Sequence, residues 1–205
     1  MQNTNIEYRS IIMRCDTINH NAYRILPDHV SIEYYKDGME TIWKDIQKAA
    51  GEFTIKSDAE IIEYFTSRFG QETDLLKKHC LFLKDSITNQ YIGTCMAWHA
   101  NQGTKSIPIL HWLAVSGDYA RQGFARKLIT LVLKILEEEH PYEPIYLHTQ
   151  PSSYPAIKLY HDFGFHICRT DTYGTAVNEY EEAVSVLKNV MTQESFESLI
   201  HDAVD

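Results

Sequence analysis

Residues 113–128 read Leu-Ala-Val-Ser-Gly-Asp-Tyr-Ala-Arg-Gln-Gly-Phe-Ala-Arg-Lys-Leu, and within this stretch an apolar strand gives way to a long amphipathic helix. The first turn of a helix leaves backbone N–H groups unpaired and carries partial positive charge, so it stabilises an anionic group. Gly123 has no side chain, which lets a pyrophosphate approach the backbone. Ala125 keeps the turn thin, while Arg121 and Arg126 add positive charge to an otherwise acidic chain. The stretch therefore predicts an anion site where this helix begins.

This turn differs from the common phosphate-binding loops. It lacks the Gly-x-x-x-x-Gly-Lys-Ser/Thr pattern of a Walker loop, and it holds only one of the three glycines of a dinucleotide-binding fingerprint. The alternative interpretation is an ordinary helix start whose glycine aids packing. Taken alone, the stretch does not choose between the two interpretations.

The hydrophobic pattern on either side indicates an alternation of strands and helices. Period-two or continuous apolar runs predict strands over residues 6–13, 79–84, 91–99, 107–115, 145–150 and 165–170. Helical spacing predicts helices over residues 38–50, 57–70, 124–136, 153–163 and 180–191, and a second short helix after 191. The order of these elements predicts a mixed sheet with helices packed on it.

Charge and cysteine content narrow the class of protein. The 205 residues include 28 acidic and 19 basic side chains, for a formal net charge of −9. This balance argues against nucleic acid as a partner and leaves room for a cationic, amine-bearing one. Four widely spaced cysteines form no Cys-x-x-Cys pair, so we expect reduced thiols and no zinc knuckle. No apolar run approaches the ~20 residues that span a bilayer, so a cytoplasmic protein without membrane contact is expected.

A second segment, residues 153–165, supports a functional interpretation of the first. Its helix opens with Ser153 and a proline and closes at a glycine that leads into a strand. Together the two segments resemble the GNAT superfamily of acyl-CoA-dependent N-acyltransferases, which carries Arg/Gln-x-x-Gly-x-Gly/Ala after its fourth strand and Ala-x-x-Leu-Tyr-x-x-x-Gly-Phe near its C-terminus. The residues that match these patterns are Gly123, Ala125, Ala156, Leu159, Tyr160, Gly164 and Phe165.

The resemblance implies an α+β fold with a mixed, mostly antiparallel central sheet flanked by helices. It predicts a GNAT-like domain over residues 1–174 and a helical extension over residues 175–205, packed on the same domain or on a partner. The chain departs from the family pattern at Ala120, where Arg or Gln is usual, and at Ser153, where many relatives carry Asn. These departures bear on affinity and acceptor more than on the fold.

The resemblance also implies a reaction, the transfer of an acetyl group from acetyl-CoA to a primary amine by direct attack. Tyr160 would act as the general acid that protonates the departing thiolate. The alternative for Tyr160 is a helix residue with its hydroxyl at the surface. The residues that the resemblance assigns to acetyl-CoA binding are Leu113, Ala114, Val115, Arg121, Gln122, Gly123, Phe124, Ala125, Arg126 and Ser153.

An amine acceptor must lose a proton before or during attack, and His111 is the candidate base. Strand alternation places it on one face with Ile109 and Leu113, although a lone strand histidine is more often structural. No histidine pair has helical metal-ligand spacing, so no metal site is expected. A small molecule or a peptide can supply the amine, and a homodimer is left open. The alternative function is a catalytically degenerate module of the same fold that binds CoA or a protein.

Overall fold

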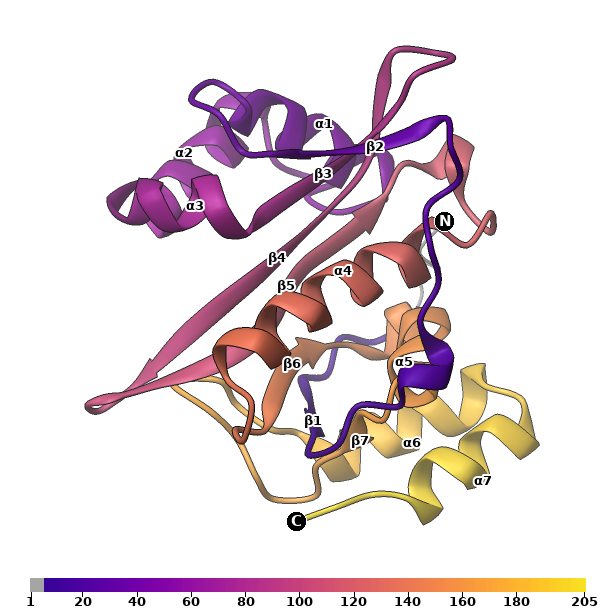
Figure 1. Ribbon diagram of the computed structural model, residues 1–205. Helices are drawn as coiled ribbons and strands as arrows, with labels where there is room; N and C mark the ends of the chain where they lie inside the picture. Colours follow the sequence, from indigo (N-terminus) through magenta and orange to yellow (C-terminus); the bar gives the residue numbers. More distant parts are fainter. Residues whose placement is uncertain (1–5) are drawn as a thin grey trace. The chain divides into compact units, whose positions relative to one another are not determined.

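The computed structural model describes residues 6–205, so the first five residues of the predicted domain 1–174 lie outside the described part (Figure 1). The chain forms two compact units, each assembled from segments that are separated in sequence. Unit 1 comprises Arg24–Trp98 and Leu110–Ile135, and unit 2 comprises residues 6–23, His99–Ile109 and Leu136–Asp205. The boundary predicted at residue 174 remains a prediction.

Seven strands are hydrogen-bonded in the order β2-β3-β4-β5-β6-β1-β7. Their bounds are β1 Ile11–Cys15, β2 Val30–Tyr34, β3 Cys80–Asp85, β4 Gln90–Gln102, β5 Lys105–Val115, β6 Ile145–Thr149 and β7 His166–Ile167. Strand β1 pairs antiparallel with both β6 and β7, and β3 pairs antiparallel with β2 and β4. Strands β5 and β6 are parallel, with Ile109 opposite Tyr146. This topology confirms the predicted mixed, mostly antiparallel sheet.

In unit 1, three helices lie beside β2 and β3 (Figure 1). They are α1 Glu40–Ala49, α2 Asp58–Phe69 and α3 Thr73–His79, with a 3-10 turn at Gly70–Glu72. Helix α2 begins with a capping box, because Ser57 and Glu60 each bond the other's backbone N–H. The faces that α1 and α2 bury carry large aromatic side chains, including Trp43, Phe65 and Phe69. These aromatic contacts form much of the core of the unit.

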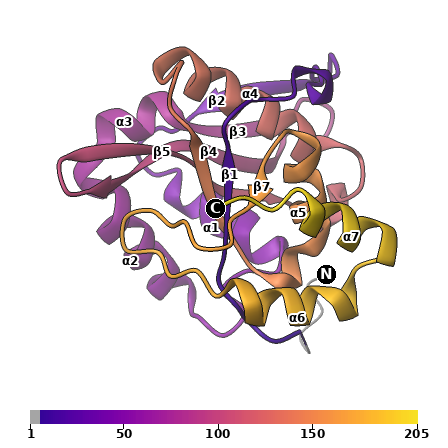
Figure 2. The same cartoon turned by 90° about the horizontal axis from the view of Figure 1, so that it is seen from below.

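The C-terminal part of the chain packs within unit 2. Its helices are α5 Tyr154–Asp162, α6 Tyr180–Val190 and α7 Gln193–His201, which Figure 2 shows gathered around β7. Beyond α7, the Val204 N–H donates to the Ile167 carbonyl at 2.9 Å, and the Val204 carbonyl accepts from the Arg169 N–H at 2.7 Å. An isolated parallel bridge thus pairs Val204 with Cys168, the residue that follows β7. The predicted helical extension is confirmed.

Several predicted elements differ in detail from the observed ones. The first strand covers Ile11–Cys15 rather than residues 6–13, and the last is reduced to His166–Ile167. Strand β2 and helix α3 were not predicted. Helix α4 runs from Phe124 to Glu139, and short 3-10 turns occupy His20–Ala22, Gly117–Tyr119 and Pro151–Ser153. Between residues 6 and 205, no helix combines the length and apolar composition that crossing a bilayer requires.

Candidate active site

The loop before α4 belongs to unit 1 and has a left-handed backbone at two positions. Arg121 has φ +62° and Gly123 has φ +80°. A Cβ built on Gly123 would meet no atom within 4 Å, so the glycine is required by its φ and faces open space. The Lys127 N–H donates to the Gly123 carbonyl at 3.3 Å, which is the first bond of the helix. The amides of the first turn therefore lack partners within the helix, as the sequence predicted.

Positive charge gathers around this helix start. Arg121 and Gln122 are exposed, and Arg126 and Lys127 are half-buried. The Lys127 ammonium lies 4.7 Å from the centre of the Phe124 ring, which is itself buried. The Gln122 side-chain amide donates to the Asp118 carbonyl at 3.3 Å. An anionic ligand at this helix end would meet both the helix dipole and nearby cationic side chains.

The C-terminal half of β5 carries Leu113, Ala114 and Val115 up to the same loop. Strand β4 approaches it closely, because a Cβ on Gly93 would lie 3.1 Å from the Ala114 carbonyl oxygen. The Ser116 N–H donates to the Ile92 carbonyl at 2.9 Å and joins the two chain segments at the end of β5. This close pairing fixes where the backbone of β5 enters the loop.

Trp112 interrupts β5 with φ +49°, a left-handed conformation that is rare for a bulky residue. Regular alternation is therefore interrupted between His111 and Leu113, and the placement of these two side chains on one face stays a prediction. The His111 ring packs edge-on to Phe69, with 5.9 Å between the ring centres. The His111 carbonyl accepts a bond from the Cys95 thiol at 3.6 Å.

Tyr160 and Ser153 belong to unit 2, where α5 positions them. Tyr160 is 7% exposed and packs edge-on to Phe165, with 6.1 Å between the ring centres. The backbone of Ser153 donates to the Gln150 carbonyl at 2.9 Å, but its side chain makes no capping bond to the helix. The site residues are thus divided between the units, with Tyr160 and Ser153 in unit 2 and the others in unit 1.

His148 on β6 is a functional candidate that the sequence reasoning missed. Its Nε2 lies 2.9 Å from the Ser10 hydroxyl and 3.4 Å from the Tyr8 hydroxyl. Although the residue is exposed, desolvation by the surrounding protein lowers its pKa. A histidine that stays neutral at neutral pH can accept a proton. The sequence feature that could have identified His148 is its position in the predicted strand 145–150.

Unit 1 also contains four neighbouring aromatic side chains, which we call the aromatic cluster: Trp43, Phe53, Tyr64 and Trp112. Phe53 and Trp112 contact each other, and Trp43 and Tyr64 each contact both of them. The Phe53 and Trp112 rings stack with 5.2 Å between their centres. Gln47, which is fully buried, donates from its amide to the Trp112 carbonyl at 3.2 Å. The Gln47 Oε1 and the Trp43 Nε1 are buried without a hydrogen-bond partner. Such atoms are expected to find a partner in water or a ligand.

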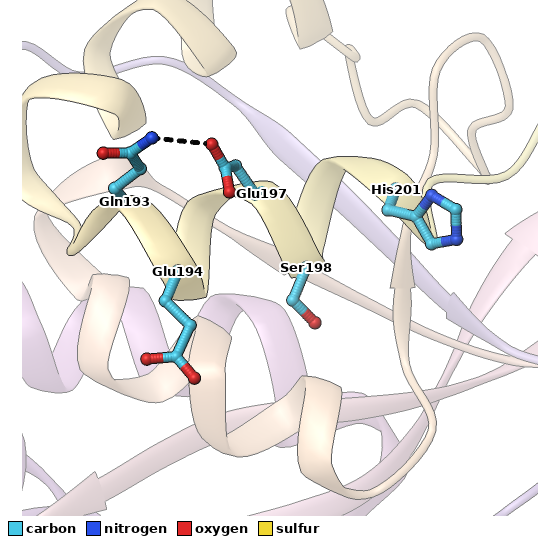
Figure 3. Close-up of a pocket in the computed structure, with 5 residues that line it drawn as sticks. All are labelled: Gln193, Glu194, Glu197, Ser198 and His201. Atoms are coloured by element: carbon cyan, nitrogen blue, oxygen red, sulfur yellow. Dashed lines mark hydrogen bonds between the residues drawn. The ribbon is translucent and has the colours of Figure 1, made fainter.

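The cysteines and the surface hollows do not add to this site. All four cysteines are free and buried, and burial raises the pKa of the Cys95 thiol, which is unfavourable for a nucleophile. A shallow hollow on α7 is lined by polar side chains, of which Gln193 donates to Glu197 at 2.9 Å (Figure 3). A second hollow lies along β2. None of the predicted site residues lines either hollow.

Comparison with known proteins shows where the chain belongs. Residues 39–165, more than half of the chain, match the model of the acetyltransferase (GNAT) family. The chain is a member of this family. The predicted resemblance is thereby confirmed, and GNAT membership supports the predicted enzyme class, an acetyl-CoA-dependent acyltransferase.

Individual proteins are similar to this chain in sequence or in fold. N-alpha-acetyltransferase 50 of Danio rerio is 36% identical over 78 residues, which make up 38% of this chain and 46% of that relative. A GCN5-related N-acetyltransferase from Sphaerobacter thermophilus superposes with a TM-score of 0.57 and 16% identity, over 78% of this chain and 50% of that one. A GNAT-family acetyltransferase from Colwellia psychrerythraea gives a TM-score of 0.56 and 12% identity, over 78% of this chain and 53% of that one. The two structures show the fold, and the chain spans about half the length of each relative.

Proposed function

We propose that this GNAT-family chain transfers an acetyl group from acetyl-CoA to a primary amine. The observation that carries the proposal is the start of α4, where Gly123 leaves the backbone open beside Arg121 and Arg126. A diphosphate fits such a place because helix-end amides and guanidinium groups both bind phosphate oxygens. The acetyl-CoA diphosphate is thus assigned to this loop, and the backbone of Leu113, Ala114 and Val115 to the rest of the carrier.

The proposed chemistry needs no acyl-enzyme. The nitrogen of the neutral amine attacks the thioester carbonyl carbon, a C–N bond forms and the C–S bond breaks. The amine gives up one proton to a base, the departing CoA thiolate takes one from the Tyr160 hydroxyl, and the proton held by the base returns through solvent to the Tyr160 phenolate. A phenol of pKa about 10 and a thiol of pKa about 8.5 are close enough for this transfer to be shared along one hydrogen bond. The products are the N-acetylated amine and free CoA thiol.

The proton that the amine loses needs an acceptor, and two histidines are proposed for it. His111 is the first, on β5. His148 is the second, and its lowered pKa favours it because the ring is then unprotonated at neutral pH. Replacement of each by Gln in separate variants distinguishes them, since loss of the true base shifts the pH profile of kcat/KM.

The acceptor class is proposed from the charge of the chain and the name of a relative. A formal net charge of −9 favours approach of a cation. The relative from Danio rerio is named as an N-alpha-acetyltransferase, so peptide N-termini belong in the acceptor panel together with small amines. The aromatic cluster offers ring faces to a cationic or aromatic acceptor. Packing of the core of unit 1 is the alternative role of these rings.

A degenerate module that binds CoA without turnover is the second candidate function. It is favoured by Ala120, which removes one expected phosphate contact, and by the absence of an acidic residue on β5. Titration calorimetry with CoA and acetyl-CoA tests the step that both functions share. We expect Gly123→Ala to weaken binding at least tenfold, and Gly38→Ala to leave it unchanged as a control with φ +97° and open space. No heat from the unaltered protein would refute both functions.

Release of free thiol from acetyl-CoA in the presence of each amine separates the two candidates. We expect Tyr160→Phe to slow release at least tenfold, and Tyr173→Phe, a second buried tyrosine of unit 2, to leave it unchanged. CoA binding without thiol release for any amine would support the binding module. Equal rates for both variants would remove Tyr160 from its assigned role.

A further inference from the structure

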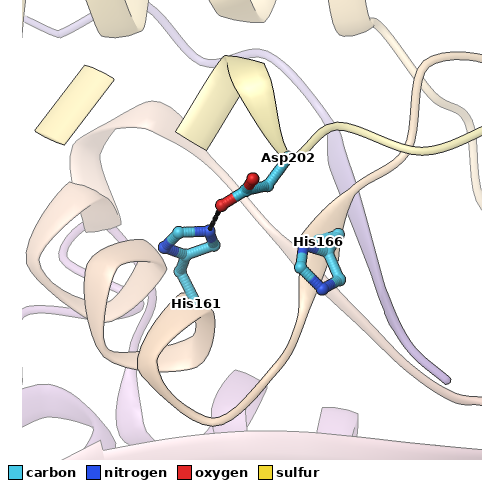
Figure 4. A group of neighbouring side chains, drawn as sticks. All are labelled: His161, His166 and Asp202. Atoms are coloured by element: carbon cyan, nitrogen blue, oxygen red, sulfur yellow. Dashed lines mark hydrogen bonds and ion pairs between the residues drawn. The ribbon is translucent and has the colours of Figure 1, made fainter. Parts of the chain in front are cut away.

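Three potential metal ligands from separate elements of unit 2 lie close together, and one of them belongs to the C-terminal extension. His161 lies on α5, His166 on β7, and Asp202 directly follows α7. One ligand atom of each residue lies within 4.8 Å of the other two (Figure 4). All three side chains are half-buried, so the group is reachable from solvent and partly screened from it.

An ion pair between two of these residues explains only part of the arrangement. The Nε2 of His161 lies 2.9 Å from an Asp202 carboxylate oxygen. The two imidazole rings are nearly perpendicular, with 5.8 Å between their centres. The Nδ1 of His166 is buried and has no hydrogen-bond partner. Buried polar atoms are normally satisfied, so this nitrogen calls for a ligand that the protein itself does not supply.

The donor set points to a particular class of ion. Two imidazole nitrogens and one carboxylate oxygen are ligands that Zn²⁺ accepts, with a water in the fourth position of a tetrahedron. Ca²⁺ and Mg²⁺ prefer oxygen ligands alone and fit this set poorly. Bonds of about 2.0–2.1 Å to a tetrahedral ion place its ligand atoms roughly 3.3 Å apart. The three ligand atoms now lie no more than 4.8 Å from one another, so no pair has to approach by more than about 1.5 Å to reach that spacing.

We propose that His161, His166 and Asp202 form a binding site for a divalent transition-metal ion, with Zn²⁺ as the best fit. The bound ion replaces the direct contact between His161 and Asp202 and gives the buried His166 nitrogen a partner. It links α5, β7 and the segment after α7, which also carries the backbone bonds of Val204 to β7. The ion therefore fastens the C-terminal extension to the helix that carries Tyr160. The role is structural, and no step of the acetyl transfer passes through it.

The sequence predicted no metal site because the cysteines form no Cys-x-x-Cys pair and no histidines have helical metal-ligand spacing. His161 and His166 are separated by the end of α5, and Asp202 lies more than thirty residues further along the chain. Only the tertiary structure brings the three together. This is the usual situation for a ligand set that does not lie on a single helix.

Calorimetric titration of the untagged 205-residue chain with zinc chloride tests the proposal. We expect one ion per chain for the unaltered protein and for His201→Ala, a control that removes an exposed histidine next to Asp202. We expect His166→Ala and Asp202→Asn each to weaken binding at least tenfold. Circular dichroism without metal checks that the variants fold, and Asp202→Asn keeps the side-chain volume should His166→Ala fail to fold.

Co²⁺ gives a second readout that does not depend on the acetyl transfer. Visible absorption of a four-coordinate Co²⁺ complex should appear with the unaltered chain and disappear with His166→Ala and with Asp202→Asn. Because all four cysteines are buried, we expect no thiolate-to-metal band. Absence of zinc uptake by the unaltered protein overturns the proposal. Binding that is unchanged in both variants also overturns it, because the ion then sits elsewhere on the surface.

Discussion

Replacement of Gly164 by Ala should be among the most damaging single-methyl changes in the chain. Gly164 ends α5 with φ +96°, and its N–H donates to the His161 carbonyl at 3.0 Å. A Cβ at this position would lie 2.5 Å from the backbone carbonyl oxygen of Thr17. Because the clashing atom belongs to the backbone, a side-chain rotation cannot relieve it. The end of α5, and Tyr160 on it, would have to move.

The expected cost has two parts, and Gly38 separates them. Gly38 has φ +97°, but a Cβ there meets no atom within 4 Å, so Gly38→Ala carries the conformational penalty alone. That penalty is about 1–2 kcal/mol for an L-residue in the left-handed region. Overpacking against the Thr17 carbonyl adds about 1–3 kcal/mol for Gly164→Ala. At about 2–4 °C per kcal/mol for a chain of this size, Gly164→Ala should lower Tm by clearly more than Gly38→Ala does.

Urea unfolding followed by circular dichroism, together with thermal melts, measures the difference between the two variants. Equal losses of unfolding free energy for Gly164→Ala and Gly38→Ala would refute the steric argument and leave only the backbone conformation. A loss for Gly164→Ala that is smaller than for Gly38→Ala would show that the Thr17 segment moves aside freely.

Three further outcomes are expected. Because the pKa of His148 is lowered, its contribution to stability is present above the ordinary histidine pKa and is lost as pH falls. His148→Gln should therefore flatten the decline in unfolding free energy between about pH 7 and 5. An unchanged slope would contradict this prediction. Burial opposes ionisation of Asp171, but hydrogen bonds from Arg14 and Tyr146 lower its pKa. Asp171→Asn should therefore lower the free energy of unfolding at neutral pH, and the difference from the unaltered protein should shrink as pH falls below about 4. A difference that stays constant with pH in urea unfolding would contradict this. Ser57→Ala breaks the capping box of α2 and should lower the free energy of unfolding by about 1 kcal/mol in urea unfolding. Ser67→Ala on the same helix should lower it by less. Equal losses for the two variants would show that the cap is unimportant.

The sequence predicted those helices and strands that carry a strong local signal. The capping box at Ser57, the long apolar stripe of α4 and the glycine after α5 each mark an element that the structure contains. Strand β2 and helix α3 were missed for different reasons. Strand β2 alternates apolar and polar residues over Val30–Tyr34, a period-two signal that the sequence analysis did not use. Helix α3 has seven residues and follows a 3-10 turn without a break, so it is too short to show a clear helical period.

Two glycines of the predicted motifs have a backbone conformation that depends on residue type. Gly123 and Gly164 both adopt the positive φ that glycine tolerates, at the positions where the sequence predicted the approach of an anion and the end of a helix. His111 shows the opposite case, because its face was predicted from alternation and Trp112 interrupts that alternation with a conformation that its residue type does not favour. His148 needed the tertiary structure, since its lowered pKa comes from desolvation by the folded protein.

The central position of β1 in unit 2 sets the order in which this part of the chain can fold during translation. Cys15 pairs with Ile145, and Ile11 pairs with Thr149, so each partner is synthesised at least 130 residues after the strand itself. Ile11, Ile12 and Met13, which are fully buried in the native state, must leave the ribosome long before they can be covered. Such a delay is typical of slow folding and of exposure to aggregation, so we expect the nascent chain to depend on chaperones that hold its first strand until β6 emerges.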